Sequence, residues 1–327
     1  MSEITVRAFR DGDEKKINDT FNRVFSLGRS LEEWYWKFRD VPGGRPIMLA
    51  WLDGEICAHY GSLPARFQVD GIEWPAAQIV DVFSTREARR LFAKRGVWVK
   101  TVERYFLGFG ERGRFPLLFG FPGKRALRLG VLQLGYDSVE PQPIRYLRRD
   151  GSTGSETFSR YLYRAELATE KDDRLDTLWQ SARSDYPVAV IRDAARVATR
   201  LSGRPGVSYH RFLVFPRFSP TPVAFAAFRT DQGRCRWVDL VWDHGHRGAL
   251  ALLSLVGRRL AHSHGAAFEE LWLNGDQAGI DFLRRRGFCE QPEPNGLVMV
   301  ARSFNQNLSV ATLDRRVYLT MADADLV

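Results

Sequence analysis

Residues 79–106 constrain the fold of this chain more than any other stretch. They begin with a short apolar, β-branched run of the kind that lies buried on both faces of a sheet, and a single carboxylate, Asp81, interrupts it. A basic turn containing Gly96 follows, and then apolar residues recur at the spacing of one face of an amphipathic helix. The apolar positions are Ile79, Val80, Val82 and Phe83, then Val97, Val99, Val102, Tyr105 and Phe106. A strand therefore leads through a turn into a helix, whose first backbone N–H groups favour an anion.

The turn resembles the R/Q-x-x-G-x-G/A pyrophosphate loop of the GNAT acyltransferase superfamily. Ala93 stands where Arg or Gln is usual, Gly96 keeps the central glycine, and Trp98 replaces the final small residue. Residues 119–126 and 134–136 resemble the later helix and the closing G-F/Y strand of the family. The resemblance implies acetyl-CoA or another acyl-CoA as co-substrate, without a metal. It assigns cofactor contacts to Val82, Phe83, Ser84, Lys94, Arg95, Gly96, Val97 and Trp98.

The order of elements begins again in the second half of the chain. Residues 278–288 resemble the A-x-x-F-Y-x-x-x-G-F helix and strand of GNAT proteins, although Leu283 stands where the family's proton-donating tyrosine is usual. Asp239, on the expected middle strand, is the counterpart of Asp81. We therefore expect an α/β (α+β) fold of two GNAT-like domains in tandem, each a mixed, mostly antiparallel sheet flanked by helices.

A polar Gly/Ser stretch predicts a linker between the two domains. The expected division is residues 1–148 for an N-terminal, CoA-binding and catalytic domain, 149–158 for the linker, 159–304 for the C-terminal domain and 305–327 for a tail. The D-x-D pattern of Asp323 and Asp325 predicts a surface cap on that tail, in preference to a cation site.

Short local patterns predict individual elements. Ser30 begins an S-L-E-E capping box, which marks the start of a helix. Asp53-Gly54 and Asp70-Gly71 are typical of turns between paired strands. In the second domain, a helix is expected near residues 188–201.

Length and composition limit the class of protein. With 327 residues, 44% of them hydrophobic and 27% charged, the chain suffices for two globular domains. The charged N-terminal stretch and the lack of a long apolar run predict neither a signal peptide nor membrane insertion, so we expect a cytoplasmic protein. Cys57, Cys235 and Cys289 lie far apart and lack metal-ligand spacing, which predicts buried thiols without disulfides or zinc.

The net charge of +9 is concentrated in residues 86–128, which hold twelve Lys/Arg against three Glu. A basic stretch beside an anion-binding turn suits the phosphates of CoA, and it also suits tRNA or another acidic polymer. A solvated helix face is the alternative without a ligand.

Acyl transfer to an amine requires a positioned neutral amine and a proton acceptor. Asp81 is the candidate base, because burial within an apolar strand would raise the pKa of its carboxyl. A structural role, in which Asp81 pairs with an arginine or with backbone N–H groups, weighs equally. His59 is the second candidate, against the interpretation as a core histidine. Tyr105 and Tyr136 are candidate acids only by proximity in sequence.

The predicted function is the transfer of an acyl group from acyl-CoA to the amine of an unknown acceptor, which is a small molecule, a sugar or a peptide. Two alternatives remain open: a tRNA-dependent aminoacyl transferase, and a non-catalytic acyl-CoA-binding or structural protein. The CoA site is expected in the first domain alone, and a homodimer is compatible with the sequence.

Overall fold

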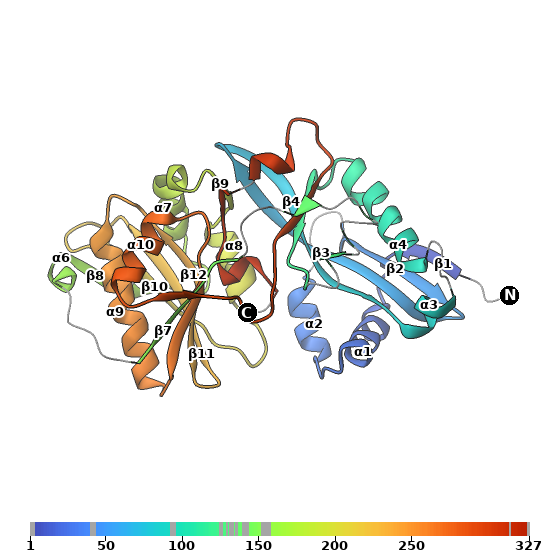
Figure 1. Cartoon of the computed structure of the whole chain (residues 1–327), viewed down its shortest axis with the longest axis horizontal. Helices are drawn as coiled ribbons and strands as arrows, with labels where there is room; N and C mark the ends of the chain where they lie inside the picture. The colour runs from blue at the N-terminus through green and yellow to red at the C-terminus, as the bar shows by residue number, and fades with distance from the viewer. Residues whose placement is uncertain are drawn as a thin grey trace.

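A computed structural model describes residues 4–39, 44–91, 96–123, 127–128, 130, 134, 137–138, 144–151, 158–313 and 315–325. They form two mixed sheets that lie side by side along the long axis of the molecule, each with helices packed on it (Figure 1). We call the part around the first sheet the first half and the part around the second sheet the second half. This architecture confirms the predicted fold class.

The first sheet has the order β1-β2-β3-β4-β5-β15-β6, and β9 pairs with both β3 and β16. Among the strands that the structure describes in this sheet, only the pairs β4–β5 and β9–β16 are parallel. The turns at Asp53-Gly54 and Asp70-Gly71 form as predicted, and all four residues have positive φ. The strands are β1 (Ile4–Ala8), β2 (Ile47–Leu52), β3 (Glu55–Val69), β4 (Ile72–Ser84), β5 (Leu117–Gly120), β6 (Asp137–Ser138), β9 (Val188–Val190), β15 (Val300–Ser303) and β16 (Val317–Tyr318).

Helices cover both faces of the first sheet. Successive residues of a strand point to opposite faces, and apolar side chains on each face pack against helices. On β2, Ile47 and Leu49 pack with α1 and α2, whereas Met48 packs with α4. The predicted cap of α2 is present, with the Glu33 amide donating to the Ser30 hydroxyl at 3.0 Å. The helices are α1 (Glu14–Phe25), α2 (Leu31–Lys37), α3 (Arg86–Leu91), α4 (Val97–Tyr105) and the π-helical turn η1 (Phe106–Glu111).

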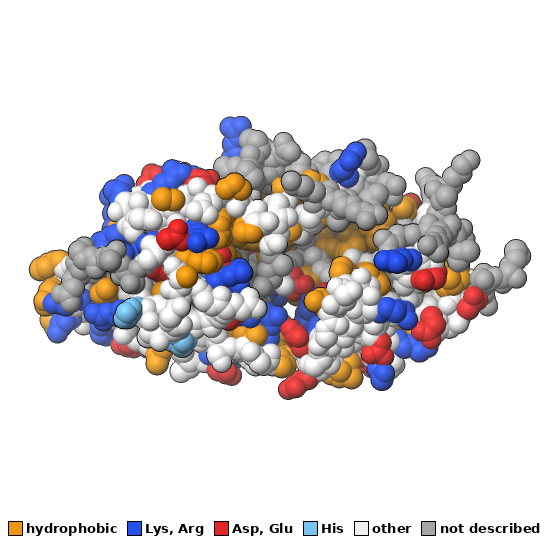
Figure 2. All heavy atoms as spheres, turned by 60° about the horizontal axis from the view of Figure 1, so that its bottom comes forward, with side chains coloured by type: hydrophobic (Ala, Val, Ile, Leu, Met, Phe, Trp, Pro, Cys, Tyr) orange, Lys and Arg blue, Asp and Glu red, His pale blue; other side chains and the backbone are white. Residues whose placement is uncertain are grey.

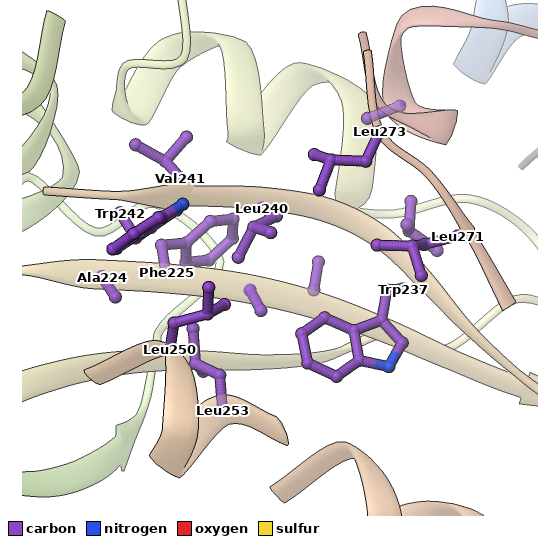
Figure 3. Close-up of a cluster of buried hydrophobic side chains, with 14 of the residues drawn as sticks. Ala224, Phe225, Trp237, Leu240, Val241, Trp242, Leu250, Leu253, Leu271 and Leu273 are labelled. Carbon is purple, nitrogen blue, oxygen red and sulfur yellow. The ribbon is translucent and has the colours of Figure 1, made fainter. Parts of the chain in front are cut away.

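The second sheet has the order β14-β7-β13-β12-β11-β10-β8, and only β12 and β13 run parallel. Its core is aromatic and aliphatic: Leu250 and Leu253 of the long helix α9 point toward Phe225 and Trp237 of the sheet (Figure 3). The strands are β7 (Tyr146–Asp150), β8 (Tyr163–Leu167), β10 (His210–Pro216), β11 (Ala224–Asp231), β12 (Arg234–Trp242), β13 (Phe268–Trp272) and β14 (Cys289–Gln291). The helices are α6 (Ser159–Leu162), α7 (Arg174–Ala182), α8 (Ala194–Leu201), α9 (Arg247–Ser263) and α10 (Gln277–Arg285), with short 3-10 turns η2 (Arg183–Asp185), η3 (Val310–Leu313) and η4 (Met321–Asp323).

The two halves exchange strands. β7 begins in the predicted N-terminal domain and runs into the predicted linker, yet it pairs with β13 of the second sheet. β15 comes from the second part of the chain yet pairs with β5 of the first sheet. β9 likewise crosses over to the far end of β3. The sheets therefore interlock, and the predicted division of the sequence does not coincide with the membership of the strands.

Three local expectations are wrong. The helix predicted near residues 188–201 is the strand β9 followed by α8, because β9 finds its partner in β3. Cys289 is exposed at the sheet edge, whereas Cys57 and Cys235 are buried as predicted. The Asp323 side chain of the expected surface cap is buried against Arg192.

Candidate active site

The parallel strands β4 and β5 separate at the centre of the first sheet. Their rungs join Ala76 to Leu117 and end with Gln78 opposite Phe119. A cavity of about 350 Å³ opens where the two strands diverge. Its lining is mostly apolar and comes mainly from β4, from the segment after β5, from Trp98 of α4 and from the C-terminal Ala324 and Asp325. We call it the acyl pocket. Figure 2 shows hydrophobic side chains in a hollow near the middle of the molecule.

A β-bulge lies in the wall of the acyl pocket. The register between β3 and β4 shifts between His59 and Gly61, and opposite this shift Asp81 has a φ of 52°. Such a left-handed conformation is unusual for a residue other than glycine, and a bulge redirects the side chains of its strand. The bulge thus places Asp81 beside the acyl pocket. The carboxylate of Asp81 reaches two cations on the face of the sheet that α1 and α2 cover.

The Asp81 carboxylate is enclosed by positive charge. Arg29 donates to it from Nη1 and Lys37 from Nζ, both at 2.5 Å, and all three side chains are buried. Burial alone would raise the pKa of Asp81, but Lys37 and Arg29 outweigh it and hold that pKa below its ordinary value. The pKa shift is therefore opposite to the expected one. The two cations are remote from this strand in the sequence, so their convergence on it could not be predicted.

His59 lies behind Asp81, within the core and outside the lining of the acyl pocket. Its Nδ1 is 2.7 Å from the Asp81 carbonyl oxygen, and its ring stacks on Phe83 with centroids 5.2 Å apart. Burial lowers the pKa of His59 to about 4, so the ring is neutral at pH 7. Gly61 makes room for it, since a Cβ there would lie 2.7 Å from His59 Cε1.

The remaining predicted residues differ in their position relative to the acyl pocket. Val82 and Trp98 line the acyl pocket, and Gly96 is the N-cap of α4 with Val97 as its buried first residue. Phe83 packs in the core beneath α1, and Ser84 pairs with Ala58 of β3, so neither reaches the pocket. Lys94, Arg95, Tyr136 and Ala93 lie outside the described residues. Tyr105 is buried with its hydroxyl 2.5 Å from that of Ser62, and it does not line the acyl pocket either.

The C-terminal segment contributes residues that sequence reasoning missed. Asp325 lines the acyl pocket and pairs with Lys37, which also binds Asp81. Arg200 of α8 donates from Nε to the Ala322 carbonyl oxygen at 3.1 Å and also bonds the Ala324 carbonyl oxygen. The segment is thereby anchored between the two halves, where Figure 1 places the C-terminus. The arginines of α8 can be seen in the sequence, but the sequence does not indicate their partners, which lie more than a hundred residues away.

The second half has an equivalent strand pair, β12 and β13, whose opening is filled. Asp239 is ion-paired with Arg192 at 3.0 Å, as Asp81 is with its cations. The Tyr186 hydroxyl donates to the Trp242 carbonyl oxygen and accepts from the Trp242 amide, and the Tyr318 hydroxyl donates to the Leu240 carbonyl oxygen. Both tyrosines are fully buried. In the second half, tyrosine hydroxyls therefore bond the backbone groups that correspond to those facing the acyl pocket in the first half.

No helix among the described residues is both long and apolar enough to cross a membrane.

Comparison with known proteins agrees with this architecture. Residues 5–126 match the family model for the acetyltransferase (GNAT) domain. No curated protein matches the chain significantly. The fold resembles that of a protein of unknown function from Enterococcus faecalis V583, described as a probable N-acyltransferase, over 93% of this chain and 73% of the other, with a TM-score of 0.69 and 13% identity.

Two further solved structures share the fold. A GCN5-related N-acetyltransferase from Anabaena variabilis is similar over 93% of this chain and 73% of its own, with a TM-score of 0.69 and 12% identity. Saccharomyces cerevisiae N-myristoyltransferase with bound myristoyl-CoA is similar over 93% and 79%, with a TM-score of 0.57 and 12% identity. Residues 5–126 thus match an acetyltransferase (GNAT) domain, and the fold of the whole chain is similar to the folds of these solved structures.

Proposed function

We propose that the chain is an acyl-CoA-dependent N-acyltransferase and that the thioester lies in the acyl pocket. The observation that carries this proposal is the cavity of about 350 Å³ at the point where β4 and β5 diverge. Beyond Gln78, backbone groups of β4 face this cavity with no described rung to β5, so a thioester carbonyl has N–H groups to accept from. The apolar lining keeps water from the thioester.

The CoA pyrophosphate is proposed to lie at the start of α4. The N-cap of this helix is Gly96, which has no side chain to bond the amides of the first turn, and Trp98 connects that turn to the acyl pocket. The surrounding basic stretch of residues 86–128 supplies counter-charge for the phosphates.

In the proposed reaction the acceptor nitrogen attacks the thioester carbon, a C–N bond forms, the C–S bond breaks and CoA leaves as the thiol or thiolate. The proton lost by the amine needs an acceptor. Asp81 and His59 remain candidates, but two cations make Asp81 a weak base and His59 is enclosed in the core. Asp325 also pairs with Lys37, but its side chain is about one-third exposed and lines the acyl pocket, so it is the most accessible of the three candidates.

Acyl-CoA binding by two matched variants tests the proposal. Ile79→Trp adds bulk at a residue lining the acyl pocket, whereas Ile72→Trp makes the same change on the same strand at a residue that is 60% exposed. We expect Ile79→Trp to weaken the binding of acetyl-CoA or a longer acyl-CoA at least about tenfold, or about 1.4 kcal/mol, with Ile72→Trp unchanged. Equal affinities in folded proteins, or no acyl-CoA binding by the wild type, would overturn it.

A further inference from the structure

We infer that the acceptor is a small primary amine that also carries an anionic group, a carboxylate or a phosphate, and that it binds in a second cavity next to the acyl pocket. This inference rests on the proposed function and names the substrate class for it. The second cavity, of about 310 Å³, is lined among others by Arg29, Glu33, Trp36, Lys37, Arg204 and Asp325. We call it the acceptor cavity.

The acceptor cavity adjoins the acyl pocket. Asp325 lines both, and Lys37 in the acceptor cavity binds Asp81 in the wall of the acyl pocket. An amine beside Asp325 therefore stands at the boundary of the two cavities, where it can reach a thioester and release its proton. The rest of the acceptor then extends among the side chains of α1, α2 and Arg204.

The charge around the acceptor cavity suits one additional negative group. Among the described side chains that line or directly pair there, the cations Arg29, Lys37, Arg200 and Arg204 outnumber the carboxylates Asp81, Asp325 and Glu33 by one. The attacking amine must be neutral, since a protonated amine has no lone pair to donate. An acceptor with a neutral amine and one anionic group would balance the excess.

Two arginines of the acceptor cavity keep unused donors. Arg29 donates from Nη1 to Asp81 and from Nε to Asn18, but its Nη2 has no hydrogen-bond partner among the described residues. Arg204 donates from Nη2 to Glu33 at 3.1 Å, while its Nε likewise lacks a partner there. The Arg29 side chain is only 7% exposed, and a buried donor without a partner is costly.

Aromatic rings hold both guanidinium groups in place. Arg29 lies over Phe21 with its Cζ 3.8 Å from the ring centroid, and Arg204 lies over Trp36 at 5.2 Å. Fixed guanidinium groups with unused donors are suited to a carboxylate or a phosphate, which accept charge-assisted hydrogen bonds. The volume of about 310 Å³ fits a metabolite of amino-acid size.

Calorimetry with matched ligands tests this inference. The full chain is titrated, with and without CoA, with the standard L-amino acids and O-phosphoethanolamine, and with the counterparts phenethylamine and ethanolamine that lack the anionic group. We expect at least one anionic amine to bind, and either L-phenylalanine or O-phosphoethanolamine to bind at least about tenfold more tightly than its counterpart. Arg204→Gln should remove the preference and leave acyl-CoA affinity unchanged. Arg217→Gln, at an exposed arginine of the second half, is the control of equal charge.

Three results would overturn this inference. Equal affinity for amines with and without the anionic group, or no binding by any anionic amine, overturns the inference. So does a preference that survives Arg204→Gln. Failure of the proposed function is separate: acyl-CoA would then not bind at all, whereas acyl-CoA binding without a preference for anionic amines overturns the acceptor class alone.

Discussion

Asp81 connects three parts of the chain that are remote in sequence. Its carboxylate joins Arg29, which follows α1, and Lys37 of α2, and through Lys37 it meets Asp325 near the C-terminus. A buried charge network of this kind is costly to break, because removal of one member leaves the others desolvated and unpaired. Asp81 thus holds the two cations beside the acyl pocket. This structural role does not depend on whether Asp81 also accepts a proton.

Replacement of Asp81 should reveal this structural role. Asp81→Asn leaves Arg29 and Lys37 buried without their shared counter-charge, and we expect a loss of about 3–5 kcal/mol in the free energy of unfolding, measured with urea. The control is Asp70→Asn, which breaks the exposed pair of Asp70 with Arg316 and should change the free energy of unfolding very little. Similar losses in the two variants would show that the network around Asp81 contributes little.

His59 predicts a dependence of stability on pH. Its pKa is about 4 in the folded chain, below the ordinary value of 6.5, so the unfolded state binds the proton more readily. The stability that neutral His59 contributes is complete above about pH 6.5 and is lost as pH falls toward 4, by roughly 3 kcal/mol since each pKa unit corresponds to about 1.4 kcal/mol.

The measurement is the free energy of unfolding between pH 7 and pH 4.5. His59→Gln should flatten the loss over that interval, while His262→Gln, at an exposed histidine, should keep the slope of the wild type. An unchanged slope in His59→Gln would mean that other groups are responsible for the pH dependence.

Among the elements, those with local causes could be predicted from the sequence and those with distant partners could not. The Ser30 cap and the turns at Asp53-Gly54 and Asp70-Gly71 depend on neighbouring residues, and they formed as expected. The residues of β9 were expected to lie in a helix, whereas their strand pairing depends on β3, more than a hundred residues earlier. The same holds for the candidate site. The strand of Asp81 and Trp98 could be recognised from the sequence, whereas Arg29, Lys37 and Asp325 come together only in the folded chain.

The start of α4 and the start of α9 should behave differently toward CoA. Gly96 has an extended backbone that aspartate also adopts, and aspartate is a favoured N-cap, so Gly96→Asp should fold while its charge repels the pyrophosphate. We expect at least about tenfold weaker CoA binding, since one or two charge-assisted hydrogen bonds of about 1.5–3 kcal/mol each are lost. Arg247→Asp, at the first residue of α9, should have no effect, because Tyr186 and Tyr318 fill the opening of the second sheet.

Calorimetry gives both the affinity and the number of sites. The expected stoichiometry is about one CoA per chain, in keeping with a filled second half. Two sites per chain, or a loss of binding in Arg247→Asp but not in Gly96→Asp, would contradict the assignment of the cofactor to the first half.

At the scale of the whole molecule, the exchanged strands join the two halves into one structural unit. β15 joins the first sheet, Arg192 and Arg200 of the second half hold the C-terminal segment, and this segment brings Asp325 to the acyl pocket. The second half therefore completes the site of the first.

Should the basic stretch of residues 86–128 serve tRNA instead, binding of tRNA would be tight at low salt and fall steeply as salt rises.

A crystal structure of the chain with bound acyl-CoA tests the central claim most directly. We expect the thioester between the diverging ends of β4 and β5, within the lining of Val80, Val82 and Phe121, and the pyrophosphate at the first turn of α4. An acyl-CoA found at β12 and α9 of the second half, or with its thioester outside the acyl pocket, would contradict the account.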